Sequence, residues 1–159
     1  MIIFNNIIFP KFTRDNFIPT NDKYFDWFKT DMNHILKLVQ FNNCTFNNFD
    51  IYRFECETLL FIDVTIQEKL TVSQCNINRL NIKTSKNINT LNIECLKSSD
   101  FIISDSNANS LILNHITFNQ IEILDSVFKK TNLNDLSIEH GKFYNTTINE
   151  IKSFSNNKF

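Results

Sequence analysis

Apolar residues recur at every fifth position along most of this chain. Counting back from Ile148 to Ile88 in steps of five, every position except Ser98 is apolar. Two one-residue interruptions shift the phase, and the pattern then continues through two further runs: Ile82, Ile77 and Val72, then Ile66, Phe61, Cys56, Ile51 and Phe46. Buried positions recur about every 3.6 residues in an amphipathic helix and every 2 residues in a strand, so neither element explains a spacing of five. The pattern therefore predicts a repeat fold in which each unit of five contributes to one continuous core.

A second set of mostly apolar or small residues lies two positions before each of these. It comprises Cys44, Phe49, Phe54, Leu59, Val64, Leu70, Cys75, Leu80, Lys86, Leu91, Leu96, Phe101, Ser106, Leu111, Ile116, Ile121, Ser126, Thr131, Leu136, Gly141 and Thr146. Lys86 is its only charged member, and most of the Asn, Asp, Lys, Glu and Ser occupy the other positions. We expect two side chains of every five to point inward and three outward.

Several of these fives resemble the repeat unit of the pentapeptide-repeat proteins, which has a small residue, Asp or Asn, Leu or Phe, and two polar residues. The clearest are 44–48 (CTFNN), 75–79 (CNINR), 106–110 (SNANS) and 131–135 (TNLND), and the resemblance covers roughly residues 42 to 150. The chain departs from the family where the first position is large, as at Phe49 and Phe54, and where Ile takes the central position.

The resemblance implies an all-β solenoid, a right-handed quadrilateral β-helix with four fives in each turn. About five coils are expected over residues 41–153. Outward Asn side chains are expected to hydrogen-bond from coil to coil, as they do in other stacked sheets.

The two ends of the chain lie outside the repeat. Residues 1–40 are predicted to form an N-terminal capping segment, because a solenoid exposes unpaired strand edges at its ends. Apolar residues at helical spacing predict a helix near 22–38, and the opening IIFNNIIFPKF is expected to form a strand or hairpin against the first coil. Residues 154–159 form a tail that ends the solenoid, lies free, or uses Phe154 and Phe159 in a dimer contact.

Charge and hydropathy narrow the range of partners. The formal net charge is −1 and the sequence pI is about 6.3, so bulk charge favours neither nucleic acid nor an anionic membrane. The opening apolar stretch lacks the basic region and cleavage site of a signal peptide, and no run is long enough for a membrane span. These features predict a cytoplasmic protein.

The residues that carry enzyme chemistry form no recognisable motif. We expect Cys44, Cys56 and Cys75 to be inward thiols and Cys95 to be outward and reactive toward thiol reagents. His34 falls in the predicted helix, while His115 and His140 occupy outward positions. Gly141 is the only glycine, which disfavours a phosphate-binding loop. We therefore expect no catalytic, cofactor-binding or metal-binding residues and no enzymatic activity.

One surface is predicted to be more apolar than the rest. In a four-sided coil every fourth five shares a face, and one such face carries Leu60, Ile62, Ile102, Leu124 and Tyr144 pointing outward. Either this face binds another protein or a second copy of the chain, or the cap or tail covers it. The predicted function is a non-catalytic protein–protein interaction module, such as an immunity protein that neutralises a toxin.

The alternative function comes from the resemblance, because some pentapeptide-repeat proteins protect DNA gyrase by mimicking DNA. That role requires an acidic rod. Residues 41–153 carry thirteen acidic and ten basic side chains, and lysines such as Lys69, Lys83 and Lys129 interrupt any negative stripe. The charge pattern therefore disfavours DNA mimicry.

Overall fold

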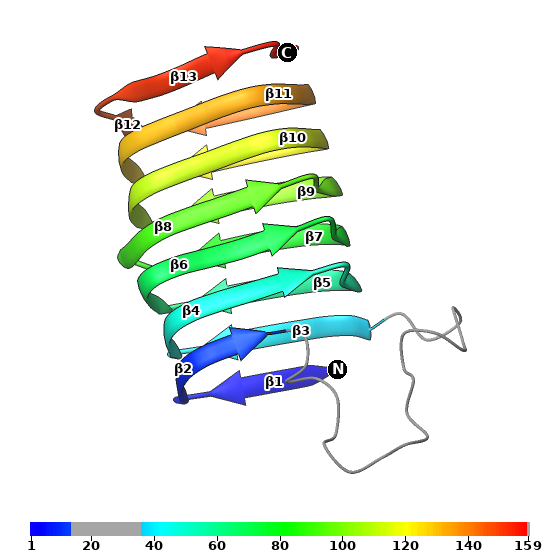
Figure 1. The fold of residues 1–159 in the computed structure, drawn as a ribbon, viewed down its shortest axis with the longest axis vertical. Helices are drawn as coiled ribbons and strands as arrows, with labels where there is room; N and C mark the ends of the chain where they lie inside the picture. The colour runs from blue at the N-terminus through cyan, green and yellow to red at the C-terminus, as the bar shows by residue number, and fades with distance from the viewer. Residues whose placement is uncertain (14–35, 159) are drawn as a thin grey trace.

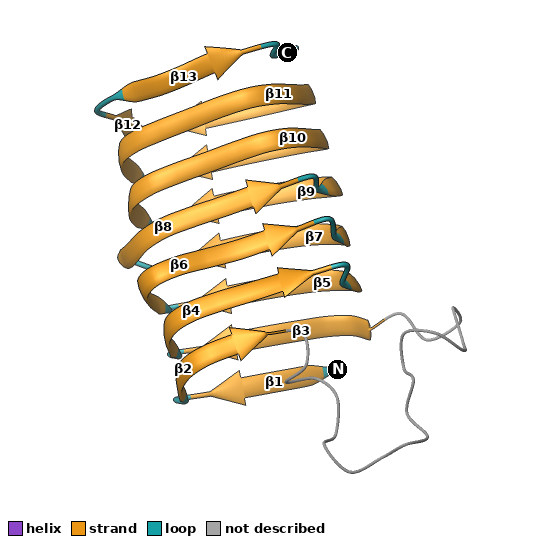
Figure 2. Cartoon of the chain, viewed as in Figure 1, coloured by secondary structure: helices purple, strands orange, loops and turns teal. Residues whose placement is uncertain are grey.

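A computed structural model of the protein describes residues 1–13 and 36–158. These residues form an all-β parallel solenoid of about six turns, and they contain no helix (Figures 1 and 2). The strands are β1 (Ile2–Asn5), β2 (Ile8–Thr13), β3 (Leu36–Asn42), β4 (Thr45–Tyr52), β5 (Glu55–Ile62), β6 (Thr65–Ser73), β7 (Asn76–Lys83), β8 (Asn87–Glu94), β9 (Lys97–Ser104), β10 (Asn107–Leu124), β11 (Val127–Tyr144), β12 (Thr147–Ile148) and β13 (Ile151–Ser155).

The strands stack in two series, which alternate along the chain. Series A contains β1, β3, β5, β7, β9 and the second halves of β10 and β11. Series B contains β2, β4, β6, β8, the first halves of β10 and β11, and then β12 and β13. All pairs are parallel, and from β3 onward paired residues lie 20 to 22 positions apart. Four fives therefore complete one turn.

The chain changes series at corners where one residue adopts a left-handed backbone. Within residues 1–13 and 36–158, thirteen residues have positive φ: Asn6, Asn43, Arg53, Asp63, Gln74, Thr84, Cys95, Asp105, His115, Asp125, Asp135, Asn145 and Asn156. Most are Asn or Asp, which tolerate this region because their short polar side chains bond locally, and none is glycine. Corner N–H groups donate to a carbonyl of the next turn, as Asp63 does to Lys83 at 3.0 Å, so the corners extend the hydrogen-bonded ladder.

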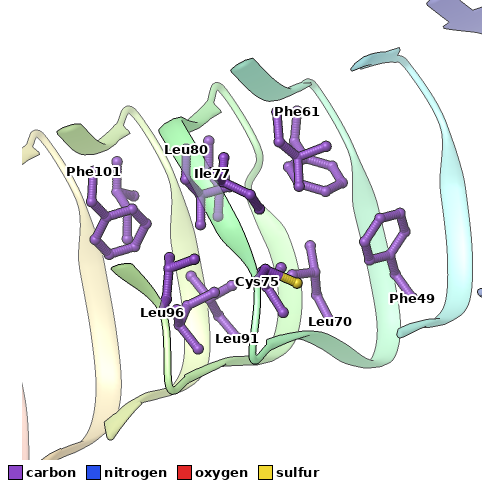
Figure 3. Packing of buried hydrophobic residues seen from close by; sticks show 14 of the residues in the cluster. Phe49, Phe61, Leu70, Cys75, Ile77, Leu80, Leu91, Leu96 and Phe101 are labelled. Carbon is purple, nitrogen blue, oxygen red and sulfur yellow. The ribbon is translucent and has the colours of Figure 1, made fainter. Parts of the chain in front are cut away.

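The two inward registers predicted from the sequence form the core, and Figure 3 shows several of their members packed inside the coil. Among the described residues, 35 buried hydrophobic side chains form one cluster. Ser98, the polar exception, is buried, and its hydroxyl donates to the carbonyl of Asn78 or Asp100, each at 3.1 Å. The inward assignment of Lys86 is wrong: Lys86 is exposed, and Ser85 is fully buried in its place. Lys86 itself is the extra residue of this turn.

Extra residues disturb the sheet, whereas large residues in the second register do not. The pairing of β6 with β4 and β8 shifts register just after Ile66, where the other interruption was predicted. A third irregularity lies between Thr131 and Asn132. Phe49 and Phe54 are completely or almost completely buried, although the family pattern has a small residue there. The coil therefore accommodates large first-position residues.

The outermost segments belong to the solenoid. Of the two alternatives for the opening segment, strands form and a hairpin does not: β1 and β2 pair in parallel with β3 and β4, which adds a turn to the five predicted. Residues 36–38, assigned to the helix near 22–38, begin strand β3, and residues 22–35 lie outside the described part of the chain. At the other end β13 continues through residue 155, so part of the predicted tail pairs with β11. Across residues 1–13 and 36–158, no helix meets the length and hydropathy that crossing a membrane requires.

Candidate interaction surface

The predicted apolar face lies on series A, where outward side chains form two adjacent rows across the turns. The pairing registers place Gln40, Leu60, Asn81, Ile102, Glu122 and Lys142 in row 1. They place Asn42, Ile62, Lys83, Ser104, Leu124 and Tyr144 in row 2. All five predicted residues therefore share one side of the molecule.

The rows break the predicted strip into three islands. Leu60 and Ile62 project from the same strand, β5, and Leu124 and Tyr144 are neighbours on successive turns. Ile102 stands alone, because Asn81 precedes it and Glu122 follows it in row 1. Four of the five side chains are half-buried by their neighbours, whereas Tyr144 is 64% exposed. The surface is an alternation of apolar and polar groups.

Charged and amide groups fill the gaps between the islands. Lys83 and Ser104 separate Ile62 from Leu124 in row 2, and Glu122 Oε1 of row 1 accepts a hydrogen bond from Gln120 Nε2 at 2.7 Å. Asn81 Oδ1 is buried without a hydrogen-bond partner in the described part of the protein. Sequence reasoning missed this acceptor, because burial at an outward position depends on the side chains of the adjacent turns.

The four cysteines differ in their exposure. Cys44, Cys56 and Cys75 are buried and Cys95 is exposed at a corner, as the repeat pattern predicts. Burial raises the pKa of the Cys56 thiol, with smaller contributions from Cys75 and Glu55. This thiol is therefore protonated and inert at neutral pH.

The two histidines in the described part of the chain, His115 and His140, are both exposed. His115 Nδ1 lies 3.1 Å from Asp135 Oδ2 on the next turn, but both side chains are at least one-third exposed. His140 is exposed, and His34 lies outside the described residues. Within residues 1–13 and 36–158, no three His, Cys, Asp or Glu side chains gather as a metal site would require.

Series B carries the amide ladders predicted from the Asn content. Asn109 Nδ2 donates to Asn89 Oδ1 at 3.1 Å, and Asn134 Nδ2 donates to Asn114 Oδ1 at 3.0 Å, in each case across one turn. The first pair lines a surface depression together with Ala108. These bonds satisfy side chains within the stack and confirm the predicted role of asparagine.

The C-terminal end of the solenoid presents a second apolar surface, which the repeat pattern did not indicate. Phe143 is 52% exposed although it occupies an inward position, and Ile151 and Phe154 on β13 are 55% and 58% exposed. The period of five identifies inward positions but does not reveal where stacking stops.

Comparison with known proteins identifies no relative: no family model, no curated protein and no solved structure matches this chain.

Proposed function

We propose that this chain is a divergent, cytoplasmic pentapeptide-repeat protein that acts without catalysis by docking another protein on the series A face. The period of five, the four fives in each turn and the small polar residues at some first positions support the family assignment. The observation that carries the docking role is the grouping of Leu60, Ile62, Ile102, Leu124 and Tyr144 in two adjacent rows.

The composition of this face suits a partner that binds and dissociates as a folded protein. Non-obligate interfaces as a whole are only about as apolar as the remaining surface, and they combine apolar anchors with polar groups. The islands around Leu60 and Leu124 supply such anchors, while Lys83 and Glu122 provide charges of both signs between them. A stacked parallel sheet also holds these anchors at fixed spacings, which lowers the entropy cost of binding.

Within this class, the role we propose to test first is neutralisation of a toxin by direct binding, as immunity proteins do. Such a protein needs a rigid surface and a partner of matching shape, and it needs no catalytic residues. The rows of series A offer the rigid surface.

The test compares two matched variants in a pull-down from the native host. Leu60→Asp places a charge in an apolar island and should lower the affinity for a specific partner by about 2 kcal/mol, the scale of an interface anchor. Ile112→Asp is the control, because Ile112 is also a half-buried outward residue, but it belongs to series B. Circular dichroism checks that both variants fold.

Selective loss of one captured protein with Leu60→Asp, and its retention with Ile112→Asp, supports docking on series A. Equal capture by both variants, or equal loss, contradicts it. If the captured protein is a toxin, co-expression should protect cells with the wild type and the Ile112→Asp variant but not with the Leu60→Asp variant.

A further inference from the structure

Two interruptions of the repeat lie beside the same surface depression. The pairing of β6 shifts register just after Ile66, and Lys86 is the extra residue of the next turn. Ile66, its neighbour Gln67 and Lys86 all line a depression of about 720 Å³. Extra residues in a strand are over-represented beside functional sites, because they redirect side chains that a regular strand would hold in line. Among the described residues, two of the three irregularities of the solenoid thus meet at one place on its surface.

The depression lies between two rows of outward side chains on series B. The rows cross β6, β8, β10 and β11, which are on successive turns (Figure 1). The lining residues are Thr65, Asn87, Asn107 and Val127 in the first row, and Gln67, Asn89, Asn109 and Lys129 in the second. Successive members of a row are about 4.8 Å apart, the spacing of neighbouring strands. The stack therefore presents polar groups at fixed spacings on both sides of the depression.

Three amides of the depression are available to a ligand. Asn109 Nδ2 donates to Asn89 Oδ1 at 3.1 Å, but Gln67, Asn87 and Asn107 form no side-chain hydrogen bond within residues 1–13 and 36–158. Each of these three amides offers two N–H donors and one carbonyl acceptor. The hydroxyl groups of a sugar both donate and accept, so a set of amides can bind several of them at once. The lining therefore favours a ligand with many hydroxyl groups.

Two lysines give the depression a positive charge. Lys86 and Lys129 both line it, and neither forms an ion pair in the part of the chain that the structure describes. Among the described residues, no Asp or Glu lines the depression. The nearby carboxylate of Glu68 accepts a hydrogen bond from Asn48 Nδ2, and Asn48 does not line the depression either. The two lysines lie two turns apart, about 10 Å along the stack, so both extended side chains can contact one anionic group between them.

We propose that this depression is a binding site for a phosphorylated sugar. Lys86 and Lys129 bind the phosphate through charge-assisted hydrogen bonds, and the amides of Gln67, Asn87 and Asn107 bind the sugar hydroxyls. Side chains supply all these contacts, so the site requires no glycine-rich loop. No aromatic ring of the described residues lines the depression, so a nucleobase would have no stacking partner, which favours a sugar phosphate over a nucleotide. The site lies on series B and is separate from the docking face on series A.

The test titrates the purified chain with a panel of hexose and pentose monophosphates and follows binding by NMR chemical shifts. Inorganic phosphate and the matching unphosphorylated sugars serve as comparison ligands. At least one sugar phosphate should bind about tenfold more tightly than phosphate or its own sugar, because only the intact ligand contacts both the lysines and the amides. Its largest shifts should fall on β6, β8 and β10. Lys129→Gln should weaken this binding about tenfold and Asn107→Ala about fivefold, the scales of a charged and a neutral hydrogen bond.

Lys130→Gln and Asn47→Ala are the matched controls, because both residues are outward on series B and neither lines the depression. Both controls should bind the sugar phosphate as the wild type does. Three results would each overturn the proposal: no binding by any member of the panel, phosphate alone binding as tightly as every sugar phosphate, or equal losses in the controls and the site variants. Leu60→Asp changes series A and should leave sugar-phosphate binding intact, so loss of this site and loss of partner docking can be told apart.

Discussion

The early and late turns follow the same path with different interiors. Between Phe4 and Phe61 the core is an aromatic cluster: Phe41 stacks on Phe4 and Phe61 at 4.8 and 5.4 Å and meets Phe12 edge to face at 5.0 Å. From Ser85 onward one corner is lined by buried hydroxyls, with Ser85, Ser106 and Ser126 on successive turns.

The same hydrogen bonds recur from turn to turn at the corner lined by these serines. The backbone N–H of Ser85 donates to Ser106 Oγ, and the N–H of Ser106 donates to Ser126 Oγ, at 3.1 and 3.2 Å. Each hydroxyl in turn donates to the carbonyl two residues before it, as Ser106 does to Ser104 at 2.8 Å. The chain path thus tolerates either a large apolar side chain or a small hydrogen-bonding one at the first position of a five.

The first way to test this contrast is to remove the centre of the aromatic cluster. Phe41→Ala deletes a fully buried ring that contacts six other phenylalanines, so we expect a loss of about 3–5 kcal/mol in the free energy of unfolding. Tyr52→Ala is the control, since Tyr52 is 53% exposed and outward. Chemical denaturation measures both, and a Phe41→Ala stability close to that of Tyr52→Ala would contradict the packed aromatic core.

The second test addresses the serine corner. Ser106→Ala leaves the buried N–H of Ser85 without its acceptor, which should cost about 1–3 kcal/mol. Ser106→Cys should cost less, because a cysteine serves at the equivalent corner position in an early turn, where Cys44 Sγ lies 3.3 Å from the carbonyl oxygen of Asn42. Equal melting temperatures for wild type and Ser106→Ala would show that the hydroxyls contribute no stability.

The period of five was enough to predict this fold, because inward positions in a solenoid depend on spacing more than on residue identity. The period of five assigned Lys86 instead of Ser85 to an inward position, and this error has a physical cause. The interruption between Ile82 and Ile88 is one residue long, and spacing alone does not say which residue is extra. The buried serine, whose hydroxyl accepts from the N–H of Val64 at 3.1 Å, settles the choice in the structure.

The candidate surface was harder to predict than the core. Assigning faces by counting fives correctly grouped Leu60, Ile102 and Leu124 on one side, but the prediction named only the apolar members of that face. Counting fives also puts the five centred on Ile82 on this face, and the strand register sets its outward Asn81 between Leu60 and Ile102. The exposed end at Phe143 was missed because the sequence pattern is the same in stacked and unstacked turns.

The smallest effect is expected at Thr84, an exposed corner residue that precedes the buried Ser85. Thr84 adopts φ 52° although it is β-branched, a conformation that suits Asn far better. Thr84→Asn should therefore stabilise the protein by about 1 kcal/mol. The new amide can also donate to a carboxylate at the same corner of an adjacent turn, as Asn145 Nδ2 does to Asp125 Oδ1 at 2.8 Å. Asp125→Thr places a β-branched residue at an equivalent corner and also removes the acceptor of Asn145 Nδ2, so it should destabilise the protein by about 1 kcal/mol or more. Thermal unfolding of the two variants should shift in opposite directions, and a shift in the same direction would show that corner conformation does not limit stability.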